Sequence, residues 1–289
     1  MFGAPQMSRL PDFIIIGAMK SATTTLYRQL ADQPGISMSA IKEPNFFSDD
    51  AQYARGIEWY KEQFAGAPEA SLAGEASTHY TKRPDYPLTV DRMSQHIAKP
   101  RLIYVMRHPI DRLISQYIHQ WSERQIQVSL TEAIRRHPEL VHYSKYHYQL
   151  EPYLQQFGSS SILPVFYEAI VENGQRELER VCEFIGYRRR PAWLQAQSRQ
   201  NISSERIRRF PGYDAIMNSN LGTKFRRSLV PQSVRTLLKN RLVMKERPKM
   251  NSELVDELEN IFNRDLEKLK PWLGRHISCA EFYQTGNST

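Results

Sequence analysis

The sequence contains only two cysteines among 289 residues, Cys182 and Cys279. This spacing fits neither a set of zinc ligands nor a disulfide framework, so we expect both to be structural thiols. Long apolar runs are missing near the N-terminus, where Phe13–Ile16 is too short to span a bilayer. No basic segment with a long apolar stretch precedes it. We therefore expect no transmembrane segment and a cytoplasmic protein.

The sequence also has no excess of acidic side chains. It contains 39 Lys and Arg and 31 Asp and Glu, which gives a formal net charge of +8. This charge favours an anionic ligand, but nucleotides, nucleic acids, anionic glycans and membrane surfaces all share that sign. Because no nucleic-acid-binding signature accompanies the charge, we expect no nucleic acid partner. The length predicts one domain over residues 1–289, with an irregular basic segment at about 199–249.

Three patterns typical of buried strands are each followed by a helical pattern. They lie at Asp12–Gly17, Arg101–Met106 and Ser161–Tyr167, although Pro164 argues against the third. Strands that alternate with helices predict an α/β fold with a mainly parallel central sheet flanked by helices. A further helix is expected within Met250–Trp272, where apolar residues recur at helical spacing.

The segment after the first predicted strand has the residue types that bind phosphate. Lys20 supplies a cation, and the hydroxyl donors are Ser21, Thr23, Thr24 and Thr25. Backbone N–H groups of a tight loop and the positive end of the next helix together form a phosphate site. The alternative is an ordinary turn that is capped by Ser or Thr.

A P-loop kinase or nucleotidase is the obvious rival for this segment. In that motif the Lys follows a Gly and precedes the Ser or Thr that binds Mg²⁺. Here Met19 precedes Lys20, and the G-x-x-x-x-G-K-[ST] spacing is absent. We therefore predict a phosphate site that requires no metal.

The stretch Phe13–Leu26 resembles the loop, written K-x-G-T-T-x-L, that binds the 5′-phosphosulfate in sulfotransferases using 3′-phosphoadenosine 5′-phosphosulfate (PAPS). The resemblance implies an enzyme with the P-loop-like sulfotransferase fold and a catalytic role for Lys20. It also implies a set of donor-binding residues: Lys20, Ser21, Ala22, Thr23, Thr24 and Thr25. Ala22 stands at the customary Gly position, where a left-handed conformation would be strained.

Two later segments resemble elements of the same family. Arg107 at a strand end is followed eight residues later by Ser115, which resembles the 3′-phosphate motif, and a guanidinium can make a forked contact to phosphate. On spacing alone, both would be ordinary structural residues. Between them, Asp111 and Arg112 are predicted to form a local ion pair. Tyr167 resembles the Tyr that approaches adenine, and a half-buried core aromatic is the alternative.

The acceptor base has three candidates. Glu43 lies in a K-E-P-x-F-F element that resembles the branch modifying heparan sulfate and similar glycans, and this resemblance implies that Glu43 removes the acceptor proton. The branch acting on small molecules uses a His, so His79 is the second candidate and His119 the third. Ser77 matches a hydroxyl position in the family's G-E-x-S segment and is expected to orient the acceptor or the sulfate.

The sequence therefore predicts a sulfotransferase that moves a sulfuryl group from PAPS to a hydroxyl or amine acceptor, which the resemblance implies is a carbohydrate. The expected partners are PAPS, its product 3′-phosphoadenosine 5′-phosphate (PAP) and that acceptor. A P-loop-type nucleotide-dependent kinase and a non-enzymatic anion-binding module are the alternatives. ATP turnover with Mg²⁺ would support the kinase, and the basic segment 199–249 favours the binding module.

Overall fold

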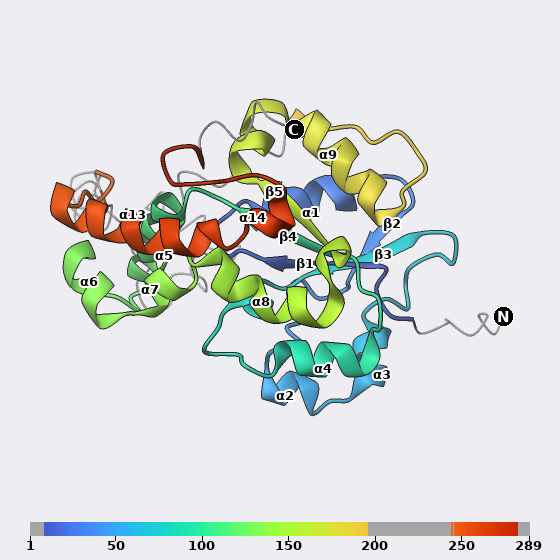
Figure 1. Cartoon of the computed structure of the whole chain (residues 1–289). Helices are drawn as coiled ribbons and strands as arrows, with labels where there is room; N and C mark the ends of the chain where they lie inside the picture. Colours follow the sequence, from blue (N-terminus) through green and yellow to red (C-terminus); the bar gives the residue numbers. More distant parts are fainter. Residues whose placement is uncertain (1–8, 196–243, 245, 283–289) are drawn as a thin grey trace, which may run out of the picture.

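The computed structural model describes residues 9–195, 244 and 246–282, and Figure 1 shows the arrangement of their helices and strands. Five parallel strands form one sheet in the order β2-β3-β1-β4-β5. The strands are β1 (Phe13–Gly17), β2 (Ile36–Met38), β3 (Leu72–Ala76), β4 (Leu102–Met106) and β5 (Ile162–Phe166). This arrangement confirms the predicted α/β fold with a parallel central sheet.

Helices cover both faces of the sheet (Figure 1). One face packs against α1 (Thr23–Ala31) and α9 (Tyr167–Ile185). The other face shares its core with α4 (Thr89–His96), α5 (Pro109–Ser122), α8 (Tyr146–Phe157) and α13 (Ser252–Glu267). The shorter helices are α2 (Asp50–Tyr53), α3 (Ile57–Glu62), η1 (Thr78–Thr81), α6 (Leu130–Arg136), α7 (Glu139–His142), η2 (Ser159–Ser161) and α14 (Lys270–Leu273).

The central strand β1 is buried along its whole length. Its successive side chains point alternately to the two faces of the sheet, and helices cover both faces. Ile15 packs towards α1 and α9, whereas Ile14 joins the core on the other face. At the end of β1, a Cβ on Gly17 would lie 2.0 Å from the Thr81 hydroxyl oxygen. That hydroxyl donates to the Ile16 carbonyl over 2.8 Å. Only glycine therefore allows η1 to approach the end of β1 so closely.

The predicted strands are present as β1, β4 and β5, whereas β2 and β3 were not predicted. The β5 strand includes Pro164, but β5 pairs only with β4 among the described residues, so the missing N–H costs no bond to a second neighbour. The sequence patterns of β2 and β3 are too weak to predict either strand. The β2 strand is only three residues long, and the Leu-Ala-Gly-Glu-Ala sequence of β3 is poor in strand-favouring residues.

The predicted C-terminal helix is present as α13 and α14, which are separated at Lys268 and Leu269. The predicted irregular basic segment 199–249 lies outside the described residues except for 244 and 246–249. Cys182 and Cys279 are both buried thiols without a disulfide. Among the described helices, none combines the length and apolar character needed to cross a membrane.

Candidate functional site

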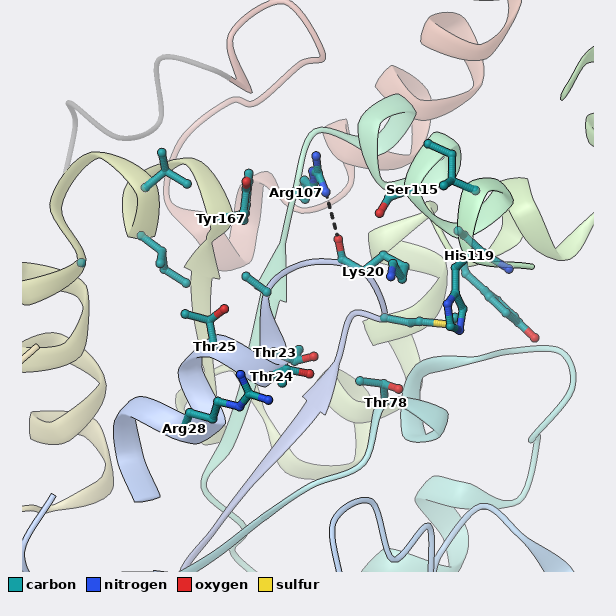
Figure 2. A pocket seen from close by; sticks show the side chains of 18 of the residues that line it. Lys20, Thr23, Thr24, Thr25, Arg28, Thr78, Arg107, Ser115, His119 and Tyr167 are labelled. Carbon is teal, nitrogen blue, oxygen red and sulfur yellow. Dashed lines mark hydrogen bonds between the residues drawn. The ribbon is translucent and has the colours of Figure 1, made fainter. Parts of the chain in front are cut away.

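Residues 18–22, called the phosphate loop because the sequence predicts a phosphate site there, connect β1 to α1 at the carboxyl edge of the sheet. Lys20 and Ala22 both have left-handed backbones, with φ of 70° and 65°, and α1 begins directly afterwards at Thr23. The three threonines of the first helical turn, Thr23, Thr24 and Thr25, line a cavity together with Lys20. Figure 2 shows them beneath the Lys20 main chain. The loop thus presents a cation, hydroxyl groups and a helix N-terminus to one cavity.

The Ser21 side chain lies apart from this set. It is fully buried and does not line the cavity, and its N–H donates to the Ala18 carbonyl over 3.2 Å. Ser21 thus faces the interior beneath the loop, whereas its neighbours Lys20 and Ala22 line the cavity.

The left-handed conformation of Ala22 costs roughly 1–2 kcal/mol. We expect Ala22→Gly to raise the free energy of unfolding by about 0.5–1 kcal/mol, because relief of strain exceeds the entropy that Gly adds to the unfolded chain. Urea denaturation would measure the change. Ala31→Gly at the last residue of α1 is the matched control and should lower the stability by up to about 1 kcal/mol. A similar loss in both variants would contradict the strain assigned to Ala22.

The cavity has a volume of about 1370 Å³. Single-ligand pockets usually measure roughly 300–1,000 Å³, so this one has room for a nucleotide and a second substrate. It is lined by predicted site residues from five separate segments: Lys20, Glu43, His79, Arg107, Ser115, His119 and Tyr167. The parallel sheet explains this convergence, because strand ends that are distant in sequence share one edge.

Arg107 follows β4 and points towards the phosphate loop (Figure 2). One of its terminal nitrogens donates to the Lys20 carbonyl over 3.3 Å, and its guanidinium lies 4.5 Å from the centre of the Tyr167 ring. Its Nε is buried and has no hydrogen-bond partner among the described residues. A buried donor without a partner is costly, so this guanidinium fits an anionic ligand. Ser115 reaches the same region from α5.

The predicted ion pair between Asp111 and Arg112 is wrong. Asp111 pairs instead with Arg247, a cavity-lining residue far along the chain. Arg112 is completely buried and donates to Gln116 Oε1 and to the Leu140 carbonyl, both over 2.8 Å. The two side chains point to different partners because adjacent positions on a helix face different directions.

Glu43 lies in the connection after β2 and lines the cavity. The Thr78 hydroxyl donates to Glu43 Oε2 over 3.4 Å. The neighbouring Lys42 donates to the Thr24 hydroxyl over 3.3 Å, which links this connection to the phosphate loop. The carboxylate of Glu43 and the phosphate-binding groups therefore face the same space.

The expectation that Ser77 orients the acceptor or the sulfate is wrong for its side chain. Ser77 is completely buried and does not line the cavity. Its hydroxyl donates to Glu75 Oε2 over 2.6 Å and accepts from the Asn45 N–H at 3.0 Å. Burial raises the pKa of Glu75 to about 7, despite the hydroxyl groups that lower it. Ser77 therefore contacts Glu75 and the Asn45 main chain, beneath the cavity, and does not contact the cavity itself.

His79 lines the cavity from η1. Its ring stacks on Tyr86 with 4.9 Å between the ring centres. Burial, and then the positive charge of Lys82, lower the pKa of His79 to about 4. The imidazole is therefore neutral near pH 7, and it is a much weaker base than an ordinary histidine.

Several cavity residues were not singled out from the sequence. Burial lowers the pKa of Lys82 to about 8, and Glu43 partly offsets this. Trp193 also lines the cavity and packs so closely on Gly174 that a Cβ there would lie 2.6 Å from the indole. Both residues lie outside the matched motifs and reach the cavity only through the fold.

No group of three or more potential metal-binding His, Cys, Asp or Glu side chains occurs within residues 9–195, 244 and 246–282.

Comparison with known sequences gives a consistent family assignment. The profile of the sulfotransferase domain matches residues 10–271. The membrane-associated sulfotransferase kil1 of Dictyostelium discoideum is 38% identical over 120 residues, which cover 40% of this chain and 24% of that protein. The heparan sulfate glucosamine 3-O-sulfotransferase 3A1 of Mus musculus is 30% identical over 190 residues, covering 63% of this chain and 47% of that protein. The chain thus spans less than half the length of these relatives.

Solved structures support the same fold. A sulfotransferase from Alicyclobacillus acidocaldarius superposes with a TM-score of 0.64 at 22% identity, covering 93% of this chain and 98% of that one. The mouse sulfotransferase SULT7A1, solved in complex with PAP, gives a TM-score of 0.56 at 14% identity, covering 96% of this chain and 90% of that one. At these identities the likeness concerns the fold.

Proposed function

The chain belongs to the sulfotransferase domain family, and we propose that it transfers a sulfuryl group from PAPS to a hydroxyl or amine acceptor. The observation that carries this proposal is the convergence of Lys20, Glu43 and Arg107 on one cavity from three separate connections. The family match favours sulfuryl transfer over a kinase or a non-enzymatic anion-binding module.

We assign the binding of PAPS to the part of the cavity that is formed by the phosphate loop and by the residues after β4 and β5. Lys20, with the N-terminal turn of α1, would hold the 5′-phosphosulfate. The Nε of Arg107, which has no partner in the described part of the chain, supports a contact with the 3′-phosphate. Ser115 adds a hydroxyl donor to the same phosphate, and Tyr167 offers a ring to the adenine.

Sulfuryl transfer requires a base for the acceptor and a positive charge near the leaving phosphate. The acceptor oxygen or nitrogen forms a bond to sulfur, and the bond between sulfur and the 5′-phosphate oxygen breaks. Glu43 accepts the proton that the acceptor loses, and Lys20 stabilises the negative charge that develops on the leaving PAP. No redox step or additional reactant is needed.

The geometry supports Glu43 over His79 as the base. The Glu43 carboxylate receives a hydrogen bond from Thr78 and lies in the connection linked by Lys42 to the phosphate loop. The His79 ring lines the same cavity but is occupied in stacking on Tyr86.

A carbohydrate is the acceptor class we propose. The relatives named as heparan sulfate sulfotransferases support this class, as does the K-E-P-x-F-F element around Glu43. The lining next to α5 also offers amide groups from Gln120 and Gln125, which can hydrogen-bond to sugar hydroxyls. The cytoplasmic location expected from the sequence stays a prediction.

A competition assay with PAPS and mixed acceptors tests the acceptor class. Glycosaminoglycan oligosaccharides with free hydroxyl and amino groups would be mixed with phenols, sterols and fatty alcohols, and sulfated products would be identified by mass spectrometry. We expect sulfate on the oligosaccharides. Sulfate found only on a phenol or an alcohol would contradict the carbohydrate assignment but leave PAPS-dependent transfer in place.

A further inference from the structure

A buried hydrogen-bond cluster lies beneath the connection that carries Glu43, and Glu75 at the end of β3 is its centre. Glu75 is completely buried and accepts three hydroxyl hydrogen bonds. Tyr60 and Tyr80 donate to Oε1 over 2.6 and 2.8 Å, and Ser77 donates to Oε2 over 2.6 Å. None of these four residues lines the cavity, so the cluster does not form part of the substrate surface.

The connection above this cluster has an unfavourable backbone conformation. Glu43 and Asn45 have φ values of 54° and 52°, in the left-handed region that residues other than glycine seldom adopt. Such residues persist only where the surrounding structure holds them in place. The Glu43–Asn45 backbone therefore needs anchoring contacts close by.

The segment that directly follows β3 provides these contacts. The Ser77 hydroxyl proton points to Glu75, which leaves the oxygen lone pairs to accept from the Asn45 N–H at 3.0 Å. The next residue, Thr78, donates to the Glu43 carboxylate over 3.4 Å. One short segment therefore contacts both the main chain and the side chain of the connection.

We propose that Glu75 is a positioning residue that acts through Ser77 to fix the backbone on which Glu43 approaches the acceptor. This inference rests on the proposed role of Glu43 as the acceptor base. The tyrosines from α3 and η1 hold the Glu75 carboxylate in place, and this carboxylate sets the direction of the Ser77 hydroxyl. A cluster that only stabilised the core would not affect turnover through Glu43.

Ser77→Ala tests the proposal, because it removes the contact to Asn45 and leaves Glu75 with its two tyrosine partners. We expect kcat to fall by roughly 10–100-fold, since small misplacements of a reacting group have effects of this size. PAP affinity should not change. Ser71→Ala is the matched control: Ser71 is a buried serine just before β3 whose hydroxyl donates to the Pro68 carbonyl, and its loss should leave kcat unchanged.

A double-mutant cycle separates positioning from general stabilisation. If Ser77 acts through Glu43, adding Ser77→Ala to Glu43→Gln should lower kcat by less than about twofold, because the group being positioned is already gone. An equal loss from Ser77→Ala in both backgrounds would overturn the proposal.

Amide hydrogen exchange at Asn45 tests the same contact without an activity measurement. Exchange should be faster in Ser77→Ala than in the wild-type protein and unchanged in Ser71→Ala. Unchanged exchange at Asn45 in Ser77→Ala would overturn the proposal. If the wild-type protein transferred no sulfate, the proposed function would fail, and the exchange result would still decide whether Ser77 anchors this connection.

Discussion

Glu43→Gln is expected to lower turnover by roughly 10²–10⁴-fold, the usual effect of losing a general base. The substitution keeps the size of the side chain and removes the group that accepts the acceptor proton. PAP affinity should change little, because the donor is assigned to Lys20, Arg107 and the first turn of α1. Steady-state kinetics with PAPS and calorimetry with PAP would separate these two effects.

His79→Ala is the matched comparison, since His79 lines the same cavity and is the second candidate base. Because its ring is occupied in stacking on Tyr86, we expect a smaller loss of turnover than for Glu43→Gln. If His79→Ala abolished turnover while Glu43→Gln kept most of it, the two assignments would have to be exchanged. Circular dichroism of both variants would show whether the fold is preserved.

Arg107→Ala is expected to weaken PAP binding by roughly 10–150-fold, because the loss of a charge-assisted contact costs about 1.5–3 kcal/mol. Adenosine 5′-phosphosulfate lacks the 3′-phosphate, so its affinity should fall much less. Calorimetry with both ligands would measure the difference.

Arg101→Ala is the control for this experiment. Arg101 is exposed and precedes β4, at the opposite end of the strand from Arg107. Its replacement should leave the affinities for both ligands unchanged. Equal weakening of the two ligands by Arg107→Ala would show that Arg107 supports the phosphate loop, through its bond to the Lys20 carbonyl, and does not read the 3′-phosphate.

The central part of the fold could be predicted because its signals are local. The β1 and β4 strands are short buried apolar runs, and each is followed by a helix with a regular apolar face. The β3 strand could not be found in this way, since its Ala-Gly-Glu sequence favours no strand by itself. It is a strand because it pairs with β1 and β2 on either side.

Some residues of the candidate site could be identified from local sequence motifs, whereas others reach the cavity only in the folded chain. Lys20, Glu43 and Arg107 lie in segments that resemble motifs of the family, and this resemblance was sufficient to single them out. Lys82 and Trp193 reach the cavity only after folding, and no spacing connects them to the motifs. Ser77 was singled out as a motif residue expected to face the acceptor or the sulfate, but it is buried under the Glu43 connection, and this burial depends on tertiary packing.

The conformation of Ala22 and the partner of Asp111 also could not be determined without the structure. The sequence indicated that Ala22 would be strained if left-handed, and the structure places it in that conformation with φ of 65°. Asp111 pairs with Arg247, which is 136 residues away, so a local pattern could not identify this partner. Contacts across such distances are decided by the packing of whole elements.

The most direct test of the central claim is the conversion of PAPS by the wild-type protein in the presence of EDTA and a glycosaminoglycan oligosaccharide. Liquid chromatography with mass spectrometry would follow both products. We predict equal amounts of PAP and of oligosaccharide that has gained one SO₃ group, without added metal. Failure to form PAP, together with consumption of ATP when Mg²⁺ is supplied, would contradict sulfuryl transfer and favour a nucleotide-dependent kinase.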